Sequence, residues 1–271
     1  MTLLQNKFRL KFSALLIFFS LIFISCQTLP DYTLTKEEIL SQINDELQNS
    51  GFSQRDFSDF SLYVCRLDLD STDFQLICKI DTKNSFTIED FAKETGAKYA
   101  INTTPFDDES SEEIKIQGIT KFNGQILSSA VEKYSALGFF YNSEGKLRAA
   151  VIQNQTDDEI QKYPAAFGGF FTILKNQEIL EYKAYKDSRI ACGIDETGRY
   201  LYILGVISKK LLGNSGMTYM ECAELLLNSG CTDAIEFDGG HSSAFVFPET
   251  GYVHPPMNRK IPAAIGFYFK D

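Results

Sequence analysis

The 271-residue chain contains no tryptophan, only two histidines and, beyond its first residues, no run of lysine and arginine. The missing tryptophan weakens any carbohydrate-stacking surface, so the 13 tyrosines would have to serve instead. Nucleic-acid binding needs clustered lysine and arginine. Because this chain carries a formal net charge of −10, we exclude nucleic acid as a partner.

The cysteines lack the spacings of a zinc site, since neither a C-x-x-C pair nor a matching Cys/His set occurs. The cysteines that follow Cys26 are odd in number, which leaves at least one unpaired in an exported protein. Cys65 and Cys78 lie symmetrically about an expected turn at 70–73, where a cross-strand disulfide would fit. The alternative is that all of them are small buried apolar residues.

The first residues have the pattern of an export signal. Lys7, Arg9 and Lys11 precede an apolar stretch at 12–24, which has about the length of a signal-peptide core and is short for a membrane span. The stretch runs into Phe-Ile-Ser-Cys at 23–26, which resembles the bacterial lipobox, in which the cysteine receives lipid. An ordinary secretory signal and an uncleaved anchor helix are the alternatives.

On this pattern we predict a lipoprotein signal peptide at 1–25, lipidation at Cys26 and a tether at 26–34. Acyl chains at Cys26 would hold the protein to a membrane of the bacterial cell envelope. The periplasmic and the surface face of that envelope are both compatible with the pattern. Targeting segments do not take part in the fold, so the prediction of structure begins after this one.

The rest of the chain shows no internal repeat and no linker rich in proline, glycine or serine. Helices are expected at 35–48, 85–95 and 218–228, where capping residues frame apolar stripes at helical spacing. Short apolar segments between turn residues predict strands. These lie at 62–69, 74–80, 99–102, 114–122, 136–141, 148–153, 169–175, 189–194, 200–207, 234–238 and 263–269.

This order of elements predicts an α+β fold, with a large mixed, mainly antiparallel twisted sheet and helices packed on it. The segments at 62–69 and 74–80 are expected to pair as a hairpin across the turn between them. Residues 35–95 would then form an N-terminal helix and hairpin region that packs on a main domain at 96–271.

The segment Ala-Ile-Glu-Phe-Asp-Gly-Gly-His-Ser-Ser at 234–243 carries the most chemical information. In a strand, Glu236 and Asp238 project to the same side, opposite their apolar neighbours. The glycine pair that follows allows a sharp turn and a close approach of the backbone to a ligand. Carboxylates on a rigid strand, an open turn and the hydroxyls beyond it make a candidate place for chemistry.

Four segments, taken in order, are similar to motifs of the phosphodiester glycosidase family: Ile101–Asp107, Ser188–Asp195, Gly216–Ala223 and Asp233–Ser243. The resemblance covers about Tyr99 to Asp271. It implies a hydrolase that cleaves the glycosidic bond of a sugar-1-phosphodiester.

The chain departs from the family pattern inside these motifs. His241 replaces the third glycine of the family's Asp-Gly-Gly-Gly-Ser, Thr103 and Thr104 replace a glycine pair, and Glu236 replaces a polar uncharged residue. These changes motivate an alternative, a non-catalytic lipoprotein that binds glycan or another envelope component on the same scaffold. A phosphodiesterase that cleaves the P–O bond is a further alternative.

Three acids are candidates for catalytic roles. Asp238 would act as general acid/base, nucleophile or metal ligand, unless it only caps the turn. Glu236 would be the second carboxylate that glycoside hydrolysis normally uses, unless it is an exposed strand residue, and two acids this close raise the pKa of one of them. Glu221 is the third, although the helix dipole also favours an acid in the first turn of a helix.

Substrate-binding roles are expected for Asn102, Arg189, Gly239, Gly240, His241 and Ser242. The Arg189 guanidinium would hold a phosphate through two parallel hydrogen bonds. Its alternative is a structural salt bridge with Asp187 or Glu221. Asn102 would bind a sugar hydroxyl or a phosphate oxygen, or else simply form a turn.

The chemistry follows from the leaving group, a phosphate monoester whose second pKa is about 6, so that it departs near neutral pH without strong protonation. The expected ligand is therefore a sugar phosphate or glycan. No cofactor is required by the pattern. The pattern is also compatible with a divalent cation, calcium or magnesium, that bridges Asp238 and the phosphate.

Overall fold

The structure is a computed structural model, and it describes residues 34–71, 74–107, 114–183, 185–211 and 214–269. The predicted signal peptide, Cys26 and all but the last residue of the predicted tether lie outside the described residues. In the described part of the chain, no helix is long and apolar enough to cross a membrane. Residues 37–271 form one compact unit.

The predicted α+β class is confirmed, with the strands divided among several sheets. The largest sheet has seven strands in the order β1-β2-β15-β14-β16-β12-β13. Its neighbouring strands all pair antiparallel. Their bounds are Phe52–Asp56, Phe60–Asp68, Tyr200–Ser208, Arg189–Ile194, Asp233–Glu236, Phe171–Lys175 and Glu178–Ile179.

Two five-stranded sheets and a two-stranded sheet complete the β-structure. The first has the order β10-β9-β11-β7-β8, with bounds Leu147–Ile152, Ala136–Tyr141, Ala165–Gly168, Thr120–Phe122 and Gln125–Ser128. The second has the order β18-β17-β4-β19-β3, with bounds Gly251–Val253, Phe245–Phe247, Tyr99–Asn102, Ala263–Phe269 and Phe74–Ile80. The short pair consists of β5 (Phe106–Asp107) and β6 (Lys115–Ile116).

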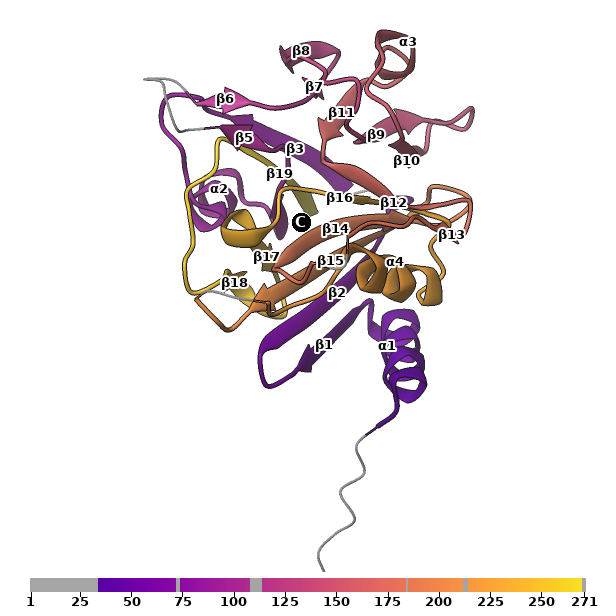
Figure 1. The fold of residues 1–271 in the computed structure, drawn as a ribbon. Coiled ribbons are helices and arrows are strands. Elements are labelled where there is room, and N and C mark those ends of the chain that lie inside the picture. Colours follow the sequence, from indigo (N-terminus) through magenta and orange to yellow (C-terminus); the bar gives the residue numbers. More distant parts are fainter. Residues whose placement is uncertain (1–33, 72–73, 108–113, 184, 212–213, 270–271) are drawn as a thin grey trace, which may run out of the picture. The chain divides into compact units, whose positions relative to one another are not determined.

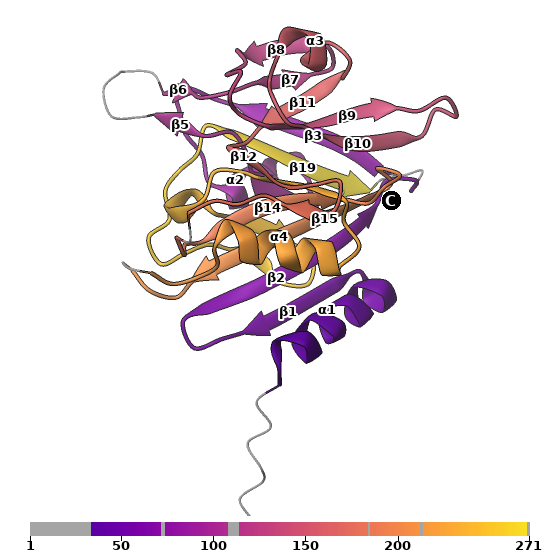
Figure 2. The ribbon, with the colours of Figure 1, turned by 45° about the vertical axis from the view of Figure 1, so that its right-hand side comes forward.

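The helices are α1 (Lys36–Ser50), α2 (Ile88–Thr95), α3 (Asp157–Ile160) and α4 (Tyr219–Asn228). Figure 2 shows α1 and α4 on one face of the seven-stranded sheet, while β3, β19, β9 and β10 lie on the other side. Two apolar cores correspond to these two faces. The helix-side core contains Leu47, Val64, Ala191 and Leu226, whereas the core between the sheets contains residues such as Ile235.

The predicted hairpin between 62–69 and 74–80 is wrong. Strand β2 pairs with β1 and β15 in the seven-stranded sheet, whereas β3 pairs with β19 in another sheet (Figure 1). Because the two strands separate, Cys65 and Cys78 lie in different sheets. The Cys65–Cys78 disulfide does not form, and all five described cysteines are free.

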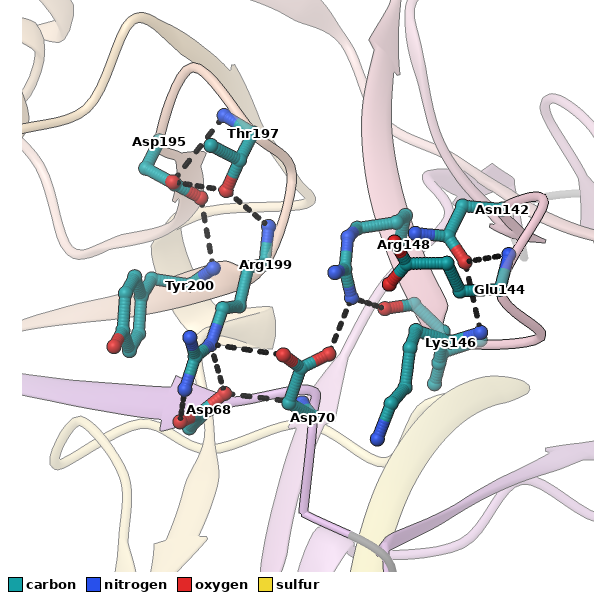
Figure 3. Close-up of polar contacts among 11 residues, drawn as sticks. Asp68, Asp70, Asn142, Glu144, Lys146, Arg148, Asp195, Thr197, Arg199 and Tyr200 are labelled. Carbon is teal, nitrogen blue, oxygen red and sulfur yellow. Dashed lines mark hydrogen bonds and ion pairs between the residues drawn. The ribbon is translucent and has the colours of Figure 1, made fainter.

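An ion-pair cluster joins the end of β2 to the turn before β15 and to strand β10 (Figure 3). The Arg199 guanidinium donates to both oxygens of Asp68, at 2.8 and 2.6 Å. Asp70 lies 3.3 Å from Arg199 and accepts a hydrogen bond of 2.6 Å from Arg148 in β10. The hydrogen bonds from Arg199 hold the pKa of Asp68 below its ordinary value. This cluster ties the seven-stranded sheet to the β9–β10 hairpin.

Candidate active site

The turn after β16 carries Asp238 and is held by the end of β4. The Asp238 N–H donates to the Thr103 carbonyl at 3.0 Å, and the Asp238 carbonyl accepts a hydrogen bond of 2.7 Å from Asn102 Nδ2. Asn102 Oδ1 in turn accepts a hydrogen bond of 3.0 Å from the Ala244 N–H. The nitrogen and the oxygen of the buried Asn102 amide therefore both hold the Asp238 turn against the end of β4. These hydrogen bonds are structural and do not show the expected contact with substrate.

The two glycines of the turn are required by its geometry. Gly240 has φ +59°, in the left-handed region, and its N–H donates to the Ser188 carbonyl at 2.9 Å. A Cβ on Gly239 would lie 3.0 Å from the same Ser188 oxygen. It would also lie 3.5 Å from Arg189 Nη1 and 3.6 Å from Glu236 Oε1, so the turn passes directly over these two side chains.

Glu236 is a buried carboxylate at the end of β16, with an exposed fraction of 0%. Its register places it between Ala191 on β14 and Phe171 on β12, on the helix side of the sheet. Neither carboxylate oxygen has a hydrogen-bond partner among the described residues, and Arg189 Nη1 lies 3.9 Å from Glu236 Oε1 as its ion-pair partner. Burial raises the pKa of Glu236 well above its ordinary value, more than Arg189 lowers it, and the charges of Asp187 and Asp238 add to the rise. The alternative of an exposed strand residue is thereby wrong.

Arg189 is enclosed by protein, with an exposed fraction of 3%. Its Nε donates to the Met217 carbonyl at 3.1 Å and its Nη2 to the Tyr185 carbonyl at 2.7 Å. The guanidinium carbon lies 4.0 Å from the centre of the Tyr219 ring. Its acidic partner is Glu236, rather than the expected Asp187 or Glu221. The guanidinium therefore orders the segments before β14 and α4, and only Nη1 faces the glycine turn.

Asp238 differs from Glu236 because its side chain is only partly buried. Desolvation raises its pKa to about 6, while a hydrogen bond from Ser242 and the charge of Arg259 act in the opposite direction. A carboxyl group with this pKa changes its charge close to neutral pH, as an acid/base catalyst requires. The turn thus presents a predicted acid whose backbone is held in place and which is not fully buried.

Glu221 has a structural role that accounts for its position. The Thr218 N–H donates to Glu221 Oε2 at 2.7 Å, and Glu221 N–H donates to Thr218 Oγ1 at 3.1 Å, which makes a capping box at the start of α4. Its other oxygen lies 3.6 Å from Lys186. The carboxylate is directed to the helix start and to Lys186, so we leave it out of the catalytic set.

His241 and Ser242 point in different directions from the turn. His241 is exposed, whereas Ser242 is buried and contacts Asp238. A hollow of about 210 Å³ opens beside the turn, lined by Gly240 and His241 together with residues of three other segments. A larger hollow of about 370 Å³ lies between β3 and the β9–β10 hairpin, and it contains none of the predicted site residues.

Asp187, Tyr219 and Arg259 lie near these side chains but were not among the predicted site residues. Asp187 lies two residues before Arg189, so the spacing of a strand could have indicated that both face the same side. Its carboxylate oxygen would lie 3.3 Å from a Cβ on Gly240. Arg259, whose charge acts on Asp238, stacks on Phe106 at 4.2 Å. No local sequence pattern around Arg259 indicates that it lies near the Asp238 turn.

Metal binding has little support in the described ranges. They contain no group of three or more His, Cys, Asp or Glu side chains that could hold a metal ion. The expected calcium or magnesium ion between Asp238 and a phosphate stays a prediction, and no chemistry below depends on it.

Comparison with known proteins relates this site to a family. A family model described as phosphodiester glycosidase matches residues 95–268. No curated protein matches the chain.

Three solved structures share the fold. One is the zebrafish N-acetylglucosamine-1-phosphodiester alpha-N-acetylglucosaminidase catalytic domain, auto-inhibited by its pro-peptide, with 16% identity, a TM-score of 0.62, and coverage of 81% of this chain and 82% of that one. A protein from Burkholderia pseudomallei K96243 has 10% identity and a TM-score of 0.59, over 84% of this chain and 79% of its own. A protein from Synechocystis has 13% identity and a TM-score of 0.58, over 81% of this chain but only 62% of its own, so this chain spans less than two thirds of it.

Proposed function

The chain belongs to the phosphodiester glycosidase family, and from this premise we propose that it is a bacterial envelope lipoprotein that hydrolyses the glycosidic bond of a sugar-1-phosphodiester. The observation that carries the proposal is the position and the pKa of Asp238. It is held at the tip of a glycine turn by Asn102 and Thr103, remains partly accessible, and has a pKa of about 6.

The proposed reaction breaks the bond between sugar C1 and the phosphate oxygen. The electron pair of that bond leaves with the phosphate monoester, which is a good leaving group because its second pKa is about 6. Water supplies the new oxygen at C1, and its proton goes to ionised Asp238, which acts as general base. The same carboxylate, being negative, also stabilises the positive charge that develops on the sugar ring.

Arg189 and Glu236 lie against the turn and support it, and in this proposal they do not take part in the reaction. Burial raises the pKa of Glu236 well above its ordinary value, while the positive charge of Arg189 lowers it. Arg189 Nη1 faces the backbone of Gly239. We infer that this charge favours an anionic phosphate beside the turn.

A second candidate, a non-catalytic glycan-binding lipoprotein, has one observation in its favour. The arginine that matches the family motif is closed off, since two of its nitrogens bind carbonyl oxygens and its exposed fraction is 3%. The two carbonyl oxygens occupy the Nε–Nη2 edge of the guanidinium, and burial shields its remaining N–H groups from solvent.

Turnover separates the two candidates. The full chain, kept in detergent, is incubated with esters of N-acetylglucosamine 1-phosphate, and sugar release is measured for the wild type and for Asp238→Asn. A general base contributes about 10²- to 10⁴-fold to the rate, so Asp238→Asn should lose at least about 100-fold. Asp70→Asn, which removes an acid of the distant cluster, is the control and should keep full activity. Binding of glycan without any turnover would favour the second candidate.

A further inference from the structure

The hollow beside the Asp238 turn has an apolar rim. Three exposed hydrophobic side chains line it, with exposed fractions of 58% for Tyr185, 59% for Leu211 and 47% for Met257. The other large exposed hydrophobics of the described residues, such as Ile126 on β8, line neither this hollow nor the turn. Grouped exposed apolar side chains of this kind mark a place for an apolar ligand group.

The same hollow also has polar lining residues and includes part of the turn. Lys210, His241 and Asp187 are among these residues. The Lys210 side chain is more than half exposed, and its ammonium lies 3.9 Å from Asp59. A group that carries negative charge can therefore be met by Lys210 and His241 near the turn, while its apolar continuation reaches the rim.

The size of the hollow limits what it can hold. Pockets that enclose a whole small-molecule ligand measure about 300–1,000 Å³. This one measures about 210 Å³, so it accommodates one part of a substrate, not a sugar, a phosphate and an alcohol together. Its place beside Gly240, two residues from Asp238, fits the part that leaves with the phosphate.

We propose that this hollow is the leaving-group subsite, and that it takes an apolar alcohol, alkyl or aryl, esterified to the sugar 1-phosphate. The proposal rests on the proposed function for the reaction but not for the binding. The phosphate lies between the turn and Lys210 with His241, and the alkyl or aryl group lies against Tyr185, Leu211 and Met257. His241 stands where the family motif has glycine, so this wall of the subsite is a feature of the present chain.

The test compares the methyl and the hexyl ester of the same sugar 1-phosphate on the full chain. Each buried methylene favours binding by about fourfold, so the hexyl ester should have a kcat/KM at least about tenfold above that of the methyl ester. In Leu211→Ser and Met257→Gln this ratio should fall toward one. In Ile126→Ser, which removes an equally exposed apolar side chain on β8, the ratio should stay at the wild-type value. Equal kcat/KM values for the two esters, or a ratio unchanged in both rim variants, would overturn the proposal.

A binding measurement separates this proposal from the proposed function. Hexyl phosphate, the product that the subsite would release, is titrated into the wild type and the two rim variants by calorimetry. If neither ester is hydrolysed but hexyl phosphate binds the wild type and binds Leu211→Ser at least about tenfold more weakly, the subsite stands and the proposed reaction fails. If hexyl phosphate does not bind the wild type, the subsite is wrong.

Discussion

The side chain of Asn102 binds the backbone of Asp238, although 136 residues separate them in sequence. The amide donates at 2.7 Å to the Asp238 carbonyl and accepts from Ala244 beyond the turn. One side chain of β4 thus holds both ends of the segment that carries the candidate catalytic acid. The position of the acid depends on a contact between two sheets.

Replacement of Asn102 by alanine should reduce activity through position, not through loss of a substrate contact. A misplacement of about 1 Å costs about 100-fold in rate, so we expect kcat to fall by about that factor while KM changes little. Asn142→Ala is the matched control, since Asn142 Oδ1 also accepts two backbone N–H groups, at 3.0 and 2.9 Å, in the distant β9–β10 turn. A large rise in KM with unchanged kcat in Asn102→Ala would instead indicate a direct substrate contact.

The activity should follow the ionisation of Asp238. Its pKa is raised to about 6, and a general base works in its ionised form, so kcat/KM should rise about tenfold per pH unit below 6 and level off above it. The pH–rate profile of the wild type measures this directly. A rate that falls as the pH rises through 6 would show that Asp238 acts as the proton donor and not as the base.

The effects of substituting Arg189 and Glu236 on the free energy of unfolding should not be additive. Arg189→Met leaves a buried carboxyl group without its charge partner, which typically destabilises by about 3–5 kcal/mol. The double variant Arg189→Met/Glu236→Gln should recover more than half of that loss in urea unfolding at pH 7. The exposed pair of Lys93 and Glu89 provides the comparison, because its removal should change stability far less than removal of the buried charge partner. Additive effects of the two buried substitutions would contradict the coupling.

The pH dependence of stability should carry opposite signs at Asp68 and Glu236. The pKa of Asp68 is lowered in the fold, so its contribution is present above its unfolded pKa and is lost as the pH falls through the folded value. The pKa of Glu236 is raised, so the folded protein loses stability as the pH rises from the unfolded toward the folded value. Chemical unfolding between pH 3 and 8 should show Asp68→Asn weakening the acid-side slope and Glu236→Gln weakening the alkaline-side slope. The Asp68 effect should stay near about 1 kcal/mol or less, because that pair is partly exposed.

Local patterns were sufficient for much of the site. The glycine turn with its two acids was predicted from residues 234–243 alone, and the strand at 200–207 lies inside the largest sheet as a continuous apolar run should. The helix at 218–228 was predicted from its apolar residues and from Gly230 beyond its end, and the structure has α4 at Tyr219–Asn228. The structure adds a capping box between Thr218 and Glu221. The catalytic role of Glu221 stays a prediction, while its carboxylate binds the start of the helix.

The strand pairing, the burial of Glu236 and the hollow depend on contacts between segments that are distant in the sequence. Turn residues between 69 and 74 favour a hairpin, yet β2 and β3 each pair with a strand more than a hundred residues away, β15 for β2 and β19 for β3. The burial of Glu236 follows from the helix α4 that covers its side of the sheet, which alternation along one strand does not show. The leaving-group hollow joins side chains from loops at 185–188, 208–211, 240–241 and 255–257, and no local pattern brings these together.

The most direct test of the central claim is the fate of the oxygen from water. A sugar-1-phosphodiester is hydrolysed by the full chain in ¹⁸O-water, and the phosphate monoester is analysed by mass spectrometry, because the free anomeric hydroxyl of the sugar exchanges with water. Cleavage at C1 leaves the bridging oxygen on the phosphate, so the account predicts an unlabelled phosphate monoester and no turnover in Asp238→Asn. An ¹⁸O atom in the phosphate would mean attack at phosphorus and would contradict it.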